Sequence, residues 1–126
     1  MNRVEKRFDD LKKRGRKAFI AYITAGDPTL ESTERLVREF EARGVDIIEL
    51  GVPFSDPIAD GPVNQEAAMR ALRNSIGIGD ILGMVKHVRA ESGIPIIFFA
   101  YYNTIHAYGV DAFVNDAAEA GLRLTW

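Results

Sequence analysis

Residues 18–50 read AFIAYITAGDPTLESTERLVREFEARGVDIIEL, and the order of patterns within this stretch decides the fold. Residues 18–24 are apolar on both faces of a strand, which is typical of a buried parallel strand. Asp27 and Pro28 suit the cap and first turn of a helix that keeps helical apolar spacing until Gly44 ends it. Residues 45–50 then form a second apolar run. Strand, helix and strand in this order predict a right-handed crossover between two parallel strands.

The same alternation extends on both sides of this unit. Apolar spacing predicts helices over residues 3–14, 65–73, 80–91 and 110–120, and a third strand over residues 94–102. Residues 122–126 alternate polar and apolar side chains, as in an edge strand with one wet face. We therefore expect a single α/β domain over residues 1–126, with strand–helix units that begin near residue 18. Three units and the start of a fourth fit either an open doubly wound sheet or part of a barrel.

Composition excludes several classes of protein. The chain has 126 residues, of which 47% are hydrophobic, so it can bury a core. Its 18 acidic and 16 basic residues nearly cancel, which gives no overall field for binding nucleic acid or an anionic membrane. It contains no cysteine, residues 1–7 lack the apolar stretch typical of a signal peptide, and no apolar run approaches the ~20 residues of a membrane span. We expect a soluble, cytoplasmic protein with no metal site.

Polar and aromatic side chains gather near the carboxyl ends of the predicted strands, where parallel α/β folds place their pockets. Side chains two apart on a strand share a face, so each of these groups stands above an apolar stem. If these faces point inward, Glu49 is a carboxylate over an apolar floor with aromatic walls. The alternative is that Glu49 reaches solvent or pairs with a basic residue at the sheet rim. The groups are Tyr22 and Thr24 on the first strand, Glu49 on the second, and Phe99 and Tyr101 on the third.

The segment after Glu49, residues 51–62, reads GVPFSDPIADGP and carries three prolines and two aspartates. Proline restricts the chain, and long loops that keep apolar residues are often binding loops. Asp60 can return toward Glu49, and two carboxylates in different surroundings suit acid–base chemistry on a neutral organic substrate. The alternative for Asp56 and Asp60 is turn or helix-cap duty.

Three runs of this sequence resemble the α chain of tryptophan synthase. They are residues 18–28, residues 49–65 and Tyr101-Tyr102-Asn103 followed by Tyr108-Gly109. The string ELGVPFSDPIADGP, residues 49–62, is highly specific to that family. The resemblance extends to Gly121 and covers about the N-terminal half of the family's usual length.

The resemblance implies an eight-stranded β/α (TIM) barrel, here about half a barrel, that cleaves indole-3-glycerol phosphate to indole and glyceraldehyde 3-phosphate without a cofactor. Glu49 would be the acid–base residue, and Asp60 would hold and polarise the indole N–H. The residues matching those that enclose the indole are Tyr22, Phe99 and Tyr101, and Thr24 matches a neighbour that supports a mobile loop. The positions matching the contact surface for the β chain, which carries pyridoxal phosphate, are Pro53, Asp56, Pro57 and Asn103.

Two other hypotheses remain. In the first, the chain is a catalytically inactive half-barrel that lacks the family's phosphate site. Such a half-barrel would associate with itself, because open strand edges and apolar inner faces favour self-association. Otherwise it is a different small α/β module that binds a phosphate or a sugar. The specific string over residues 49–62 makes the second of these the weaker hypothesis.

Overall fold

Three parallel strands form one sheet whose spatial order follows the chain: β1 (Ile20–Thr24), β2 (Ile47–Gly51) and β3 (Ile96–Phe99). The computed structural model describes residues 1–122. Ile20 pairs in register with Ile47, and Ile48 pairs with Ile96. Parallel neighbours require crossovers, and helices provide them. The predicted α/β alternation is confirmed.

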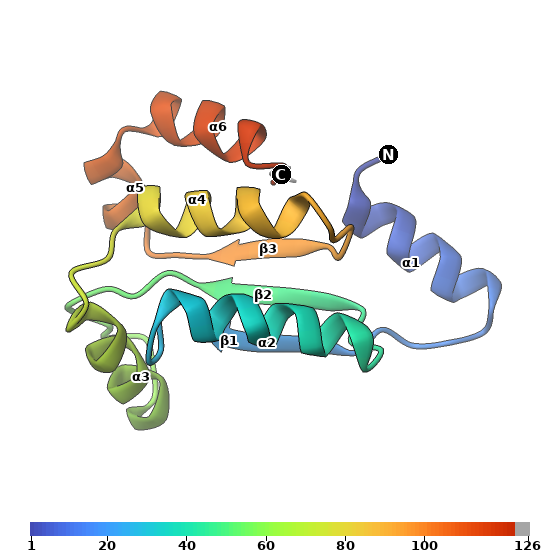
Figure 1. The fold of residues 1–126 in the computed structure, drawn as a ribbon, viewed down its shortest axis with the longest axis horizontal. Coiled ribbons are helices and arrows are strands. Elements are labelled where there is room, and N and C mark those ends of the chain that lie inside the picture. The colour runs from blue at the N-terminus through green and yellow to red at the C-terminus, as the bar shows by residue number, and fades with distance from the viewer. Residues whose placement is uncertain (123–126) are drawn as a thin grey trace.

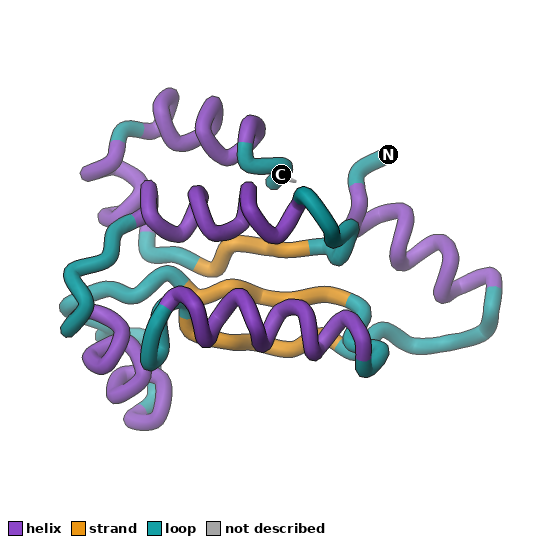
Figure 2. The backbone as a smooth tube through the Cα atoms, in the orientation of Figure 1, coloured by secondary structure: helices purple, strands orange, loops and turns teal. Residues whose placement is uncertain are grey.

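Helices surround the sheet unevenly. Figure 1 shows α2 and α4 along one face, α1 beyond the amino ends of the strands, and α3 and α5 near the carboxyl ends. Figure 2 shows the same arrangement with helices and strands in different colours, and α2 passes across the strands in this view. The bounds are α1 (Arg3–Lys13), α2 (Leu30–Ala42), α3 (Pro62–Leu72), α4 (Ile78–Arg89), α5 (Tyr102–Tyr108) and α6 (Val110–Glu119).

The hydrophobic core fills the space between the sheet and the helices α2 and α4. Fully buried Ile48 and Leu50 of β2 belong to one cluster with Val37 of α2 and with Ile81 and Val85 of α4. Burial of this apolar surface drives the two helices onto the sheet. The other face of the sheet, which we call the inner face, is therefore the one left for a site.

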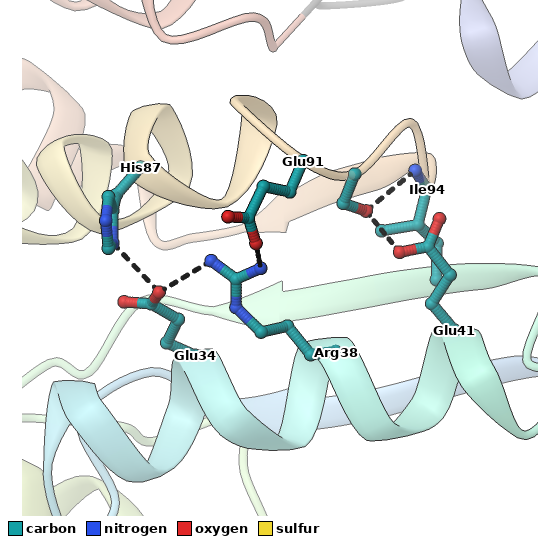
Figure 3. A network of polar contacts seen from close by, with 7 residues as sticks. Glu34, Arg38, Glu41, His87, Glu91 and Ile94 are labelled. Atoms are coloured by element: carbon teal, nitrogen blue, oxygen red, sulfur yellow. Dashed lines mark hydrogen bonds and ion pairs between the residues drawn. The ribbon is translucent and has the colours of Figure 1, made fainter.

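A polar network joins α2 to α4 and the segment after it (Figure 3). Its members are Glu34, Arg38, His87 and Glu91 at one end and Glu41, Ser92 and Ile94 at the other. Arg38 Nη2 lies 2.9 Å from Glu34 Oε1, and His87 Nδ1 lies 2.8 Å from the same oxygen. The hydrogen bond from Arg38 is the main reason that the pKa of the Glu34 carboxyl lies below its ordinary value, and His87 adds to it. The network links the two core helices along their solvent-facing side.

The structure corrects the predicted start of α2. The cap is Thr29, whose side chain accepts a hydrogen bond from the Ser32 N–H at 3.1 Å. Asp27 instead accepts two hydrogen bonds from Arg70 of α3, at 2.8 and 2.9 Å. The prediction was wrong because a fork of two charge-assisted hydrogen bonds across the fold competes with local capping.

The third strand is also shorter than predicted. It ends at Phe99, and residues 102–108, partly assigned to the strand, form α5 instead. Tyr101 is the N-cap of that helix, and its carbonyl accepts a hydrogen bond from the Thr104 N–H. The neighbouring strand β2 ends at Gly51, so few backbone groups remain for the chain beyond Phe99 to pair with. Most of the edge strand predicted over residues 122–126 lies outside the described residues.

Residues 1–122 contain neither a membrane-spanning helix nor a group of metal-binding side chains. None of their helices combines the length and the apolar character that crossing a membrane requires. These residues also bring no three His, Asp or Glu side chains together in a group that could hold a metal ion.

Candidate functional site

The inner face of the sheet carries the predicted side chains in layers. Residues paired in register across parallel strands share a face, so the pairing shows directly which side chains are neighbours. One layer consists of Tyr22, Glu49 and Ile97, and the next toward the carboxyl ends consists of Thr24, Gly51 and Phe99. The expectation that Tyr22, Thr24, Glu49 and Phe99 share one face is confirmed.

Tyr22 and Phe99 form an aromatic corner above Gly51. Their ring centroids lie 5.9 Å apart in an edge-on arrangement, with 88° between the planes. A Cβ atom placed on Gly51 would lie 2.1 Å from the Tyr22 hydroxyl, so glycine is what allows the ring to cross the end of β2. Tyr22 is 36% and Phe99 55% exposed, so both rings present surface on which a flat apolar ligand can stack.

Glu49 stands beside this corner, between Tyr22 and Ile97 in the register. Its side chain is half-buried, and within residues 1–122 its carboxylate makes no hydrogen bond or ion pair. The alternative in which Glu49 pairs with a basic residue at the sheet rim is therefore not realised in the described part of the chain. A half-buried carboxylate without a partner, over apolar neighbours, is a group that can exchange a proton with a ligand.

Thr24 ends β1 and is 9% exposed. The backbone around it is tied on both sides, because the Ala25 N–H donates to Gly51 at 2.8 Å and the Asp27 N–H donates to the Thr24 carbonyl at 3.3 Å. The first of these hydrogen bonds holds the carboxyl ends of β1 and β2 together beyond the ladder, and the second closes the turn that follows β1. Thr24 is thus part of the floor at this end of the sheet.

Tyr101 does not continue the layers of β3. Its ring stacks on Phe54, with centroids 5.0 Å apart and 31° between the planes, and its hydroxyl accepts a hydrogen bond from the Ala59 N–H at 3.0 Å. Tyr101 is therefore joined to the β2–α3 loop, which was not expected from its predicted place on the strand. The stack and the hydrogen bond pin both arms of this loop, residues 52–61, to the end of β3.

Asp60 lies in a tight turn of that loop. Its N–H donates to the Pro57 carbonyl at 3.0 Å, and its own carbonyl accepts a hydrogen bond from Gln65 Nε2 at 2.9 Å. In the part of the chain that the structure describes, the Asp60 carboxylate has no hydrogen-bond or ion-pair partner. Sequence reasoning missed Gln65, although a glutamine within one turn of a helix start after Gly-Pro was a signal that it could reach back to the loop.

The residues predicted to contact a partner chain differ in exposure. Asp56 and Asn103 are exposed, Pro57 is half-buried, and Pro53 is buried. Ile58, in the same loop, is 90% exposed, which is unusual for such an apolar side chain. The loop and the start of α5 therefore offer a mixed polar and apolar surface next to the aromatic corner.

Comparisons with known proteins identify the family. A family model described as tryptophan synthase alpha chain matches residues 8–124. The tryptophan synthase alpha chain of Caldanaerobacter subterraneus subsp. tengcongensis is 50% identical over 122 residues, which make up 97% of this chain and 47% of that protein. The crystal structure of tryptophan synthase subunit alpha from Legionella pneumophila str. Paris has a TM-score of 0.94 and 46% identity, and covers 97% of this chain and 47% of its own. A crystal structure of tryptophan synthase from M. tuberculosis has a TM-score of 0.89 and 35% identity, over 97% of this chain and 49% of its own.

These neighbours confirm the predicted fold class, the parallel β/α (TIM) barrel, of which the described residues form about half. The chain spans about half the length of the curated relatives that it matches. The matched residues include all of the inner-face layers and the whole β2–α3 loop. The chain belongs to the tryptophan synthase alpha chain family.

Proposed function

We propose that the protein has the lyase activity of its family and cleaves indole-3-glycerol phosphate to indole and glyceraldehyde 3-phosphate in tryptophan biosynthesis. The observation that carries the proposal is the placement of the unpartnered Glu49 carboxylate beside the aromatic corner of Tyr22 and Phe99. The corner supports stacking of the indole ring, and Glu49 lies within the same layers. Tyr101 contributes by holding the loop that carries Asp60.

The proposed reaction is a retro-aldol cleavage. Glu49 takes the proton of the side-chain hydroxyl and delivers a proton to the ring carbon. The bond between that ring carbon and the hydroxyl-bearing carbon breaks, its electron pair returns to the ring system, and the hydroxyl-bearing carbon becomes the aldehyde. Asp60 accepts a hydrogen bond from the indole N–H and stabilises the positive charge that develops on the ring nitrogen. No cofactor takes part in this step.

We also propose a β-chain partner, as the family assignment implies. Exposed Asp56 and Asn103, with Pro57, lie on the mixed surface beside the site, and this arrangement supports docking there. Pro53 would act by shaping the loop, because it is buried. In this proposal pyridoxal phosphate belongs to the partner, which receives the indole.

The test is release of indole from indole-3-glycerol phosphate by the purified chain and by two variants. Glu49→Gln keeps the shape of the side chain and removes its proton chemistry, so we expect indole release to be abolished. The matched control is Glu66→Gln, the same change at an exposed position on α3, which should leave the rate as it is. An unchanged rate in Glu49→Gln would remove Glu49 from the proposed role.

A second candidate function is self-association of the chain, as a single half-barrel domain over residues 1–126 without turnover. It is favoured by the apolar surface that the inner face exposes, since Ile20 is 41%, Tyr22 36% and Phe99 55% exposed. The mass in solution by light scattering, measured on the sample used for indole release, decides between the two. A dimer or larger species without activity supports this candidate, and a monomer of 14.0 kDa contradicts it.

A further inference from the structure

The side-chain amide of Gln65 holds both ends of the turn that presents Asp60. Gln65 Nε2 donates to the Pro57 carbonyl at 3.2 Å and to the Asp60 carbonyl at 2.9 Å. The Asp60 N–H donates to the same Pro57 carbonyl at 3.0 Å. One amide group therefore closes the turn of residues 57–60, using both of its hydrogens.

Helix α3 gives this amide a fixed base. The Gln65 N–H donates to the Gly61 carbonyl at 3.0 Å, which places Gln65 in the first turn of the helix. Long side chains in a helix lean toward its amino end, so a glutamine at this position reaches the loop that enters the helix. Further along α3, Ala67 and Ala71 are buried, and Arg70 is tied to Asp27 after β1.

The turn is held from its other side by Tyr101, the N-cap of α5. Ala59 donates its N–H to the Tyr101 hydroxyl, and the ring of Tyr101 stacks on Phe54. The Asp60 carboxylate itself has no polar partner within residues 1–122, so no hydrogen bond or ion pair of its own fixes it, and its position follows the backbone of the turn. A change that opens the turn would leave the carboxylate free to sample other positions.

We propose that Gln65 is a positioning residue: by closing the turn of residues 57–60 it directs the Asp60 carboxylate to the indole N–H. This inference rests on the proposed function, in which Asp60 accepts that hydrogen bond. It predicts that Gln65 sets the preference for a ring that carries an N–H over a ring of the same shape that carries none. Apolar stacking on Tyr22 and Phe99 does not depend on it.

The experiment compares two probes, indole and benzofuran, which has an oxygen in place of the N–H. Their dissociation constants are measured by NMR titration of the 126-residue chain and of four variants. Gln65→Glu and Gln65→Met remove the amide donor with and without a new charge, so the second keeps the test valid if the first does not fold. Asp60→Asn defines the preference that remains without the carboxylate. Asn64→Asp is the matched control, since it makes the same amide-to-acid change at the preceding, exposed position.

We expect the unaltered chain to prefer indole by about ten-fold or more, the scale of a hydrogen bond to a charged group. In Gln65→Glu and Gln65→Met this preference should fall to that of Asp60→Asn, while the affinity for benzofuran changes by less than about two-fold, since the apolar contact is retained. Hydrogen exchange at the Ala59 and Asp60 amides should speed up about ten-fold, as expected for local opening. Asn64→Asp should leave both quantities unchanged.

Two outcomes overturn the inference, and they are distinguishable. If the Gln65 variants keep the full preference for indole, or keep slow exchange at Ala59 and Asp60, Gln65 does not position Asp60, and the proposed function stands. If the unaltered chain itself shows no preference for indole, the role of Asp60 in the proposed function fails and the inference fails with it. The exchange rates still report in that case whether Gln65 closes the turn.

Discussion

Gly26, in the turn after β1, combines a left-handed backbone with a close neighbour, and replacing it with alanine tests both features. Its φ is +85°, and a Cβ atom placed on it would lie 2.2 Å from Cδ1 of Ile76. The Gly26 N–H also donates to the buried hydroxyl of Thr33 at 2.9 Å, which limits how far the turn can shift. We expect Gly26→Ala to lower the free energy of unfolding by about 2–4 kcal/mol.

Three effects make up this magnitude. A left-handed conformation costs an L-residue about 1–2 kcal/mol. Forcing an extra carbon into a filled site costs about 1–3 kcal/mol. Alanine also restricts the unfolded chain, which returns about 0.4–1 kcal/mol of stability. The steric part depends on whether Cδ1 of Ile76, the far end of that side chain, can rotate away, because the next nearest atoms lie at an ordinary 3.4 Å.

Gly44 provides the matched control, since its φ is +91° and nothing lies within 4 Å of a Cβ placed there. Gly44→Ala carries the backbone cost alone, so we expect a loss of about 1 kcal/mol. Ile76→Val removes only the carbon that would clash. The double variant Gly26→Ala/Ile76→Val should therefore be about 1–2 kcal/mol more stable than the sum of the two single losses predicts.

Urea unfolding followed by circular dichroism measures all four variants against the unaltered chain. The slopes with denaturant should agree, so that shifts of the midpoint report stability. Equal losses in Gly26→Ala and Gly44→Ala would refute the claim that Ile76 closes on Gly26. Strict additivity of Gly26→Ala and Ile76→Val would refute it as well.

Three further predictions concern the helix layer and the core. The hydrogen bond from Arg38 lowers the pKa of the Glu34 carboxyl, so it stabilises the folded state at neutral pH. This stabilisation is lost as the pH falls through the lowered pKa. Glu34→Gln should thus lower the free energy of unfolding by about 1 kcal/mol at pH 7 and by far less at pH 3, as measured by thermal unfolding. The control is Glu39→Gln, which breaks an exposed pair with Arg43 of the same spacing and should cost under about 0.5 kcal/mol at either pH. Burial lowers the pKa of Arg89 to about 10, so it stays charged at neutral pH and donates to the carbonyls of residues 92, 94 and 121. Arg89→Met should cost about 2 kcal/mol in urea unfolding, and a loss below 0.5 kcal/mol would contradict this role. Ile48→Ala, at a fully buried position of β2, should cost about 2–5 kcal/mol, against about 0.5–1.5 kcal/mol for Ile48→Val in the same assay.

The sequence was most informative about the strands. Apolar residues on both faces of residues 18–24 and 45–50 predicted parallel strands, and period two placed Tyr22 with Thr24 on one face of the first strand. That Glu49 lies on the same face of the sheet was a condition that the register then met. The loop over residues 51–62 was singled out by its prolines and aspartates. These features are local, so the sequence displays them directly.

The errors arose where distant residues compete with local preferences. Asp27 has the chemistry of a helix cap, but Arg70 lies more than forty residues away along the chain and no local pattern predicts their pairing. Tyr101 belonged to an apolar run that predicted a strand. The pairing between β2 and β3 nevertheless ends at Gly51 and Phe99, because β2 is no longer than that, and the sequence around Tyr101 does not show the length of β2. Gln65 was missed because its side chain donates to carbonyl groups of the backbone, and a sequence does not display these as a motif.

The sheet whose spatial order repeats the chain order has a consequence for the growing protein on the ribosome. Both strands of the β1–β2 pair are synthesised before β3, and about 45 residues separate the end of β2 from the start of β3. At about 5–20 residues per second, translation of that interval takes roughly 2–9 s. Small elements of secondary structure form within microseconds to milliseconds, which is much faster than translation. The strands β1 and β2 can therefore pair and dock with α2 before β3, the neighbour at the far edge of β2, has been made. During those seconds the nascent chain carries a row of unpaired backbone N–H and C=O groups along that edge of β2.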